Sequence, residues 1–106
     1  MKMTNTKIIE ELVQQELKEA NEIHPQFHSD HEAIAVIAEE YDECKDELQQ
    51  VERLISYMWS EVKENESIKS TLRWTKKRAM NLAAEAIQVA AMCEKGLARY
   101  ADTEDM

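Results

Sequence analysis

The sequence contains almost none of the residues that break or bend a chain, with one glycine and one proline among 106 residues. Tight turns draw on these two residues, so few and short connections are expected. Valine and isoleucine rarely alternate with polar residues, which argues against strands. There is also no apolar run long enough to span a bilayer, and no basic start followed by an apolar centre, the pattern of a secretory signal. We therefore predict an all-α protein of one domain, residues 1–106, without a membrane-spanning segment.

Basic residues are scarce as well. Lysine and arginine number 13 against 22 for aspartate and glutamate, which gives a formal net charge of −9. Such a charge is repelled by phosphate backbones and anionic lipids, so neither nucleic acid nor a membrane is expected as a partner. The two cysteines, Cys44 and Cys93, lack the short spacing of metal ligands and lie on apolar helical stripes. This favours reduced core residues of a cytoplasmic protein over a disulfide or a zinc site.

The spacing of apolar residues predicts helices over residues 6–23, 30–64 and 67–96, followed by a polar tail over 97–106. Pro25 ends the first helix, and Ser29 with Glu32 forms a capping box at the start of the second. Gly96 is the expected cap at the end of the third helix. The only plausible turn between the second and third helices lies at residues 65–67, although a kink or a continuous helix remains open there.

Apolar residues three and four apart form a seam along both long helices. In the second helix the seam runs from Ile34 to Val62, and in the third it runs from Ile68 to Cys93. Its members alternate between the a and d positions of a heptad. Two such seams predict an antiparallel helical hairpin packed through its a and d positions. Because further apolar side chains lie off these seams, we expect a homodimer or homotetramer to complete the bundle.

Two polar pairs stand out on these helices, Glu40 with Glu43 and Glu85 with Gln88. Residues three apart lie on one face of a helix, and both Glu40 and Glu85 precede an a position, so they occupy g positions that face each other in an antiparallel pair. The two pairs differ in height by about 5 Å along the axis. Grouped oxygen ligands of this kind can hold Mg²⁺, with Mn²⁺ as a second possibility. The alternative is an ordinary solvated acidic surface, but Glu85 and Gln88 interrupt a nearly apolar stretch, which favours partners inside the protein.

The stretch Glu39-Glu40-Tyr41-Asp42-Glu43 resembles the Glu-Glu-x-x-Glu motif of the MazG-like all-α nucleoside triphosphate pyrophosphohydrolases. Glu85 matches the start of the second family motif, Glu-x-x-Asp, and Gln88 stands at its aspartate. The resemblance spans residues 29–97 and extends to small phage-type members. It implies Mg²⁺-dependent hydrolysis of a nucleoside triphosphate to the monophosphate and pyrophosphate. By the same resemblance, the metal ligands are Glu40, Glu43, Glu85 and Gln88, and the catalytic residues are Glu39 and Glu40.

The only basic cluster, at residues 76–78, is the candidate for substrate binding. Arg78 lies on the same edge as Glu85, two turns away, and with Lys77 it is predicted to bind the triphosphate. The alternative is ion pairing with acids such as Glu47 or Glu52. Three functional hypotheses therefore remain: an active hydrolase, a protein that binds metal or nucleotide without efficient turnover, and a purely structural bundle.

Overall fold

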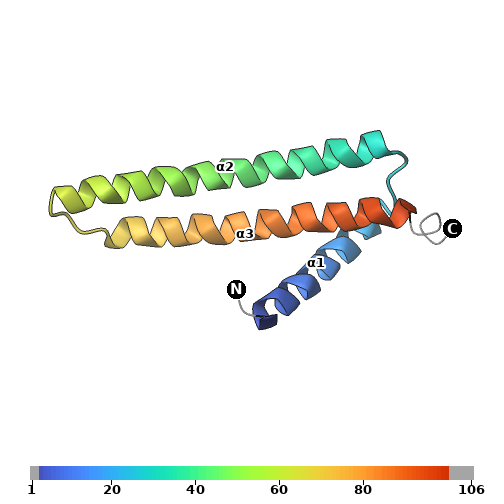
Figure 1. Cartoon of the computed structure of the whole chain (residues 1–106), viewed down its shortest axis with the longest axis horizontal. Coiled ribbons are helices and arrows are strands. Elements are labelled where there is room, and N and C mark those ends of the chain that lie inside the picture. The colour runs from blue at the N-terminus through green and yellow to red at the C-terminus, as the bar shows by residue number, and fades with distance from the viewer. Residues whose placement is uncertain (1–2, 101–106) are drawn as a thin grey trace.

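The computed structural model describes residues 3–100, which form three long helices and a short 3₁₀ helix (Figure 1). The elements are α1 (Met3–Ile23), α2 (Asp30–Lys63), α3 (Lys69–Leu97) and η1 (Ala98–Tyr100). No strand occurs among these residues, so the prediction of an all-α fold is confirmed. Of the predicted polar tail, residue 97 ends α3, residues 98–100 form η1, and residues 101–106 lie outside the described part of the chain.

Helices α2 and α3 form a long antiparallel hairpin, and α1 crosses the C-terminal half of α3 at an angle (Figure 1). The principal extents are 63 × 31 × 25 Å and the radius of gyration is 18.0 Å, whereas a compact domain of this length has a radius of gyration of about 13 Å. Within residues 3–100, no helix combines the length and the apolar character needed to cross a bilayer.

The start of α2 follows its sequence signal closely. The Ser29 hydroxyl accepts a hydrogen bond from the Glu32 backbone N–H at 3.1 Å. The Glu32 carboxylate accepts from the backbone N–H of His28 at 3.3 Å, one residue before the position that a standard capping box uses. This end of the helix is therefore satisfied by residues that are adjacent in the sequence.

The connection between α2 and α3 is a turn, and the continuous helix is excluded. Asn65 has a φ of 57°, the left-handed conformation that asparagine tolerates better than most residues. The Asn65 N–H donates to the Val62 carbonyl at 3.1 Å, and the Glu66 N–H donates to the Glu61 carbonyl at 2.8 Å. This pair of hydrogen bonds is a Schellman motif. The predicted cap at Gly96 is wrong, because α3 continues through Gly96 to Leu97.

The two long helices meet through d and g positions, not through a and d as predicted. The d residues Cys44 and Val51 are partly buried, as are the g residues Glu40 and Glu47. The a residues are exposed; Tyr41, for example, is 57% exposed. Each helix is therefore rotated about its own axis relative to the predicted packing. The physical cause is that polar g residues form hydrogen bonds and ion pairs across the hairpin. The partners include Thr71, which donates to Glu61 at 2.6 Å, and Arg78, which pairs with Glu47 at 3.4 Å.

The small core lies where α1 crosses the hairpin. Its buried apolar residues are Val13, Phe27, Ala33, Ala91 and Met92. Lys95 is 6% exposed beside them; its ammonium group donates to the His24 carbonyl and lies 4.7 Å from the centre of the Phe27 ring. No large side chain among the described residues is fully buried. The chain on its own therefore has a modest core at one end and an open hairpin at the other.

Candidate metal centre

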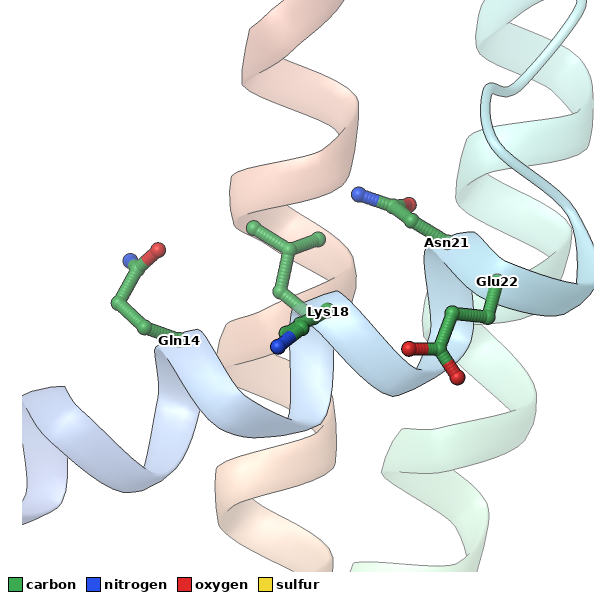
Figure 2. Close-up of a pocket in the computed structure, with 5 residues that line it drawn as sticks. Gln14, Lys18, Asn21 and Glu22 are labelled. Atoms are coloured by element: carbon green, nitrogen blue, oxygen red, sulfur yellow. The ribbon is translucent and has the colours of Figure 1, made fainter.

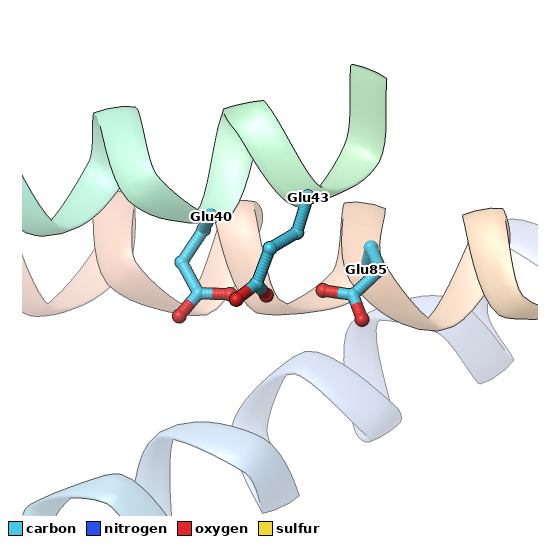
Figure 3. A group of neighbouring side chains, drawn as sticks. All are labelled: Glu40, Glu43 and Glu85. Atoms are coloured by element: carbon cyan, nitrogen blue, oxygen red, sulfur yellow. The ribbon is translucent and has the colours of Figure 1, made fainter. Parts of the chain in front are cut away.

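Three glutamates converge across the hairpin. Glu40 and Glu43 extend from α2 toward Glu85 on α3 (Figure 3). One carboxylate oxygen from each lies within 4.8 Å of the others. We call Glu40, Glu43 and Glu85 the acidic cluster. The predicted ligands are thus brought together, with Glu40 and Glu85 partly buried and Glu43 exposed.

Gln88, the fourth predicted ligand, also lies at the cluster. With its amide nitrogen turned toward the carboxylates, it donates to Glu40 Oε2 at 2.7 Å and to Glu85 Oε2 at 3.3 Å. The same side chain turned by half a rotation would present its carbonyl oxygen instead, since the two ends of an amide have nearly the same shape. Gln88 can therefore bridge two carboxylates without a cation or offer one oxygen ligand to a cation.

The carboxylates of the cluster destabilise one another's charged forms. Partial burial, followed by the neighbouring charge of Glu43, raises the pKa of Glu40. Partial burial, a hydrogen bond with Glu43 and the charges of Glu43, Glu40 and Glu47 raise the pKa of Glu85. Both shifts arise first from burial, and neighbouring negative charge adds to them; a bound cation would favour the charged form of each carboxylate. Three oxygen donors and an amide oxygen suit a hard cation such as Mg²⁺ better than a soft one.

A thiol, Cys44, lies beside the cluster and is held toward its protonated form. Burial, together with the charges of Glu85 and Glu40, raises the pKa of Cys44. The protonated thiol is the unreactive form. Both cysteines are free; Cys44 is half-buried, but Cys93 is exposed, so the expectation that Cys93 is a core residue is wrong for the single chain.

The remaining predicted residues lie around the cluster without joining it. Glu39 is exposed on α2 next to Glu40. Arg78 pairs with Glu47, as the alternative reading of the basic cluster expected, and the Lys77 ammonium lies 5.6 Å from the centre of the Trp74 ring. Their role in binding a triphosphate stays a prediction.

Two further carboxylates affect the cluster and were not predicted as site residues. Glu16 on α1 adds to the raised pKa of Glu40, and Glu47 adds to that of Glu85. Glu47 also has a buried oxygen, Oε2, without a hydrogen-bond partner in the described chain. The heptad offered a signal for Glu47, which repeats the position of Glu40 seven residues later. No local pattern places Glu16 there, because it depends on how α1 crosses the hairpin.

A cavity of about 510 Å³ lies where the end of α1 and the loop that follows it meet α2 and α3. Its lining includes Phe27, Val36, Met92 and Lys95. Val36 and Met92 each lie one helical turn, about 6 Å, from Glu40 and Gln88 respectively. The groove in Figure 2 follows α1 past Gln14, Leu17, Lys18, Asn21 and Glu22, and no residue of the acidic cluster lines this groove or the cavity.

Comparisons with protein families, with curated proteins and with solved structures give no match for this chain. The interpretation of function therefore rests on the acidic cluster and the residues around it.

Proposed function

We propose that this protein is a Mg²⁺-dependent nucleoside triphosphate pyrophosphohydrolase of the MazG-like type, acting in the cytoplasm. The observation that carries the proposal is the convergence of Glu40, Glu43 and Glu85 from two helices into one group of oxygens. These three residues are also the ones that the resemblance to the family motifs selects. The raised pKa values of Glu40 and Glu85 support it, because burial and neighbouring carboxylates both disfavour the charged forms, which a cation would stabilise.

In this proposal the acidic cluster and the carbonyl oxygen of Gln88 hold Mg²⁺ or Mn²⁺. The ion, when bound, neutralises phosphate oxygens and lowers the pKa of a bound water. Glu40 orients that water as well as the ion, and Glu39, adjacent and exposed, accepts its proton. Gln88 must turn its amide for this role and give up the hydrogen bonds to Glu40 and Glu85, which weakens binding relative to an aspartate at that position.

The cavity beside the cluster supports a nucleotide as the ligand. Val36 and Met92 place it about one helical turn from the cluster, so a phosphate chain at the cluster can extend its nucleoside into the cavity. Phe27 offers an aromatic surface to a base there. Arg78 lies on the opposite side of Glu85 from the cavity. By leaving its ion pair with Glu47, it would bind the far end of a triphosphate, and Lys77 adds a second positive charge nearby.

The test is pyrophosphate release from a panel of common and modified nucleoside triphosphates, with Mg²⁺ or Mn²⁺ and with a chelator. We expect metal-dependent release by the wild-type protein and its loss in Glu43→Gln. Asp42→Asn is the matched control, because Asp42 is an exposed neighbour on α2 outside the cluster. A wild-type protein that binds metal but turns over no triphosphate in the panel would contradict the hydrolase.

A second candidate is metal or nucleotide binding without efficient turnover. The observation that favours it is Gln88, which satisfies Glu40 and Glu85 by hydrogen bonds and carries no charge. This hypothesis predicts that Mg²⁺ or Mn²⁺ at millimolar concentration raises the melting temperature without pyrophosphate release. If metal leaves the melting temperature unchanged, the purely structural bundle is the remaining interpretation.

A further inference from the structure

One face of the hairpin is mainly apolar and is left uncovered by the rest of residues 3–100. It consists of the a positions of both helices and the e position four residues after each of them within the same helix, and every one of these residues is exposed. We call it the apolar face. On α2 it comprises Ile34, Ala38, Tyr41, Lys45, Leu48, Glu52, Ile55, Trp59 and Val62, and on α3 it comprises Leu72, Lys76, Ala79, Ala83, Ala86, Ala90, Cys93 and Leu97.

Helix α1 leaves this face uncovered, because it packs against other positions of α3. Its contacts with the hairpin centre on Ala91 and Met92, which are 0% and 7% exposed. On the apolar face, Ile34 is 60%, Leu48 is 53% and Leu72 is 50% exposed. Large aliphatic side chains repeated every seven residues are typical of helices that pack against another helix on that stripe.

We propose that a second copy of this chain covers the apolar face and forms a symmetric dimer, in which each α2 packs against α3 of the other copy. A symmetric interface requires a surface that complements itself. The α2 half of the face carries mostly large side chains, and the middle of the α3 half is a strip of alanines at residues 79, 83, 86 and 90. A two-fold axis parallel to the helices brings the large side chains of each copy onto the alanine strip of the other.

The register of the hairpin makes this match specific. Glu40 contacts Gln88 and Glu47 pairs with Arg78. The residues that follow Glu40 and Glu47, Tyr41 and Leu48, are therefore nearly level with Ala86 and Ala79. A two-fold axis along the hairpin preserves these levels, so Tyr41 and Leu48 of one copy meet Ala86 and Ala79 of the other. The product is a four-helix bundle with antiparallel neighbours throughout.

The exposed surface of the chain is large enough to require such a partner. The accessible surface is 8378 Å², about a third more than the 6,100 Å² typical of a compact monomer of this mass. The apolar face from Ile34 to Val62 is about 40 Å long and about 20 Å, two helices, wide. Its area of about 800 Å² equals what each partner contributes to a stable interface of standard size.

Charge also selects a second copy. The chain carries 22 acidic residues, but the apolar face contains a single carboxylate, Glu52, against the ammonium groups of Lys45 and Lys76. The pairs Glu47–Arg78 and Glu61–Thr71 bracket Glu52 and Lys76 along the hairpin, so the last two are nearly level. Neither has an ion-pair partner among residues 3–100. In the dimer, Glu52 of each copy faces Lys76 of the other at the margin of the interface.

The experiment is sedimentation equilibrium of the full chain, with helix content followed by circular dichroism. The wild-type protein is expected at twice the chain mass of 12.3 kDa, and Leu48→Glu is expected at the chain mass with its helix content retained. The dissociation constant should rise about a hundredfold or more, because two carboxylates per dimer would be buried among apolar groups. Ile8→Glu is the matched control, because Ile8 on α1 is 54% exposed and lies outside the apolar face.

A second set of variants protects the test against simple misfolding of Leu48→Glu. Glu52→Lys and Lys76→Glu should each weaken the dimer several-fold by placing like charges opposite each other, and the double variant should restore it. A wild-type protein that stays monomeric at about 100 µM overturns the proposal. Dissociation by Ile8→Glu but not by Leu48→Glu overturns it as well, as does a double variant no tighter than its single parents. The metal site has no part in these outcomes, so they are independent of the proposed hydrolase.

Discussion

The two sides of the α2–α3 hairpin differ in how their side chains are satisfied. On the side of the g positions, polar groups meet across the helices and α1 adds cover, so carboxylates such as Glu40 and Glu85 are held partly buried. On the side of the a positions, large apolar groups such as Ile34 and Leu48 remain exposed. On the first side, no basic side chain among residues 3–100 pairs with the acidic cluster, and on the second side the large apolar groups lack packing partners. We propose a different partner for each side, a cation for the acidic cluster and a second copy of the chain for the apolar face.

The largest expected effect comes from removing one ligand on the acidic side. Glu43→Gln keeps the size of the side chain and removes its charge, so metal-dependent pyrophosphate release should fall by about a hundredfold or more. Leu48→Glu, on the apolar side, should retain activity per chain if the two sides are functionally separate. Steady-state assays of both variants measure the comparison directly. Equal loss of activity in both would break the separation between the two sides.

Gln88→Asp sharpens the acidic side by adding the missing charge. The affinity for Mg²⁺ should rise about tenfold, since a carboxylate replaces a neutral amide among the ligands. The metal-free protein should melt at a lower temperature than the wild type, because the bridge from Gln88 to Glu40 and Glu85 becomes a repulsion. Calorimetric titration and thermal melts in chelator give both values. An unchanged affinity for Mg²⁺ would show that residue 88 is not a ligand.

The raised pKa values of Glu40 and Glu85 predict how the stability of the metal-free protein depends on pH. Between the ordinary glutamate value of 4.5 and their raised values, the folded state binds more protons than the unfolded state. The free energy of unfolding should therefore increase as the pH falls from neutrality toward 4.5. In Glu40→Gln/Glu43→Gln/Glu85→Gln this gain should be absent.

Comparing the wild type with the triple variant separates the effect of the cluster on stability from that of carboxylates with lowered pKa values. The pKa values of Asp30 and Glu32 are lowered, chiefly by hydrogen bonds with Tyr100 and His28, so their stabilisation is lost as the pH falls below the ordinary values. Both proteins share that loss. Denaturant unfolding in chelator from pH 7 to pH 4 gives the difference in free energy of unfolding between the two proteins. A wild-type protein that gains no stability relative to the triple variant on acidification would contradict the raised pKa values of Glu40 and Glu85.

The two native cysteines allow the apolar face to be compared with the contact between α2 and α3 in the wild-type protein, without any substitution. Cys93 lies on the apolar face, whereas Cys44 is half-buried between α2 and α3. As the protein concentration rises through the dimer range, the rate of thiol labelling at Cys93 should fall about tenfold while the slow rate at Cys44 stays constant. Mass spectrometry of timed labelling reactions measures both rates. A rate at Cys93 that is independent of concentration would argue against burial of that face.

The smallest expected effect serves as a control that touches neither side. Gly96 lies inside α3, and a methyl group added there would be 3.9 Å from the Ala33 methyl, an ordinary contact. Gly96→Ala should stabilise the protein by about 0.5–1 kcal/mol through helix propensity. Metal affinity and oligomeric state should not change. If Gly96→Ala raised stability and also changed metal affinity or oligomeric state, the changed property would depend on global stability and not on the local face.

Much of the fold could be predicted from the sequence because its signals are local. The Ser29 cap, the break at Pro25 and the turn at Asn65 each depend on residues within one or two turns of each other. The acidic cluster could be predicted as well, because spacing and an antiparallel register suffice to bring Glu40 near Glu85. These features survive any modest rotation of the two helices.

The rotation itself could not be predicted. A heptad gives the period of the seam, but it does not decide whether a or g positions join d at the contact within one chain. That choice depended on hydrogen bonds across the hairpin, such as Thr71 to Glu61, and on α1 packing against Ala91. The path of α1 could not be predicted either, since it is held by contacts between residues far apart in the sequence, such as Lys95 and His24. For this reason Glu16 near the cluster and the exposure of Cys93 were not expected.

The central claim, that the acidic side of the hairpin binds a divalent cation, is tested most directly by anomalous diffraction from crystals grown with Mn²⁺. The account predicts an anomalous peak between Glu40, Glu43 and Glu85, at about 2.0–2.3 Å from one oxygen of each. Crystals with fully ordered glutamates and no peak among them at millimolar Mn²⁺ would contradict it.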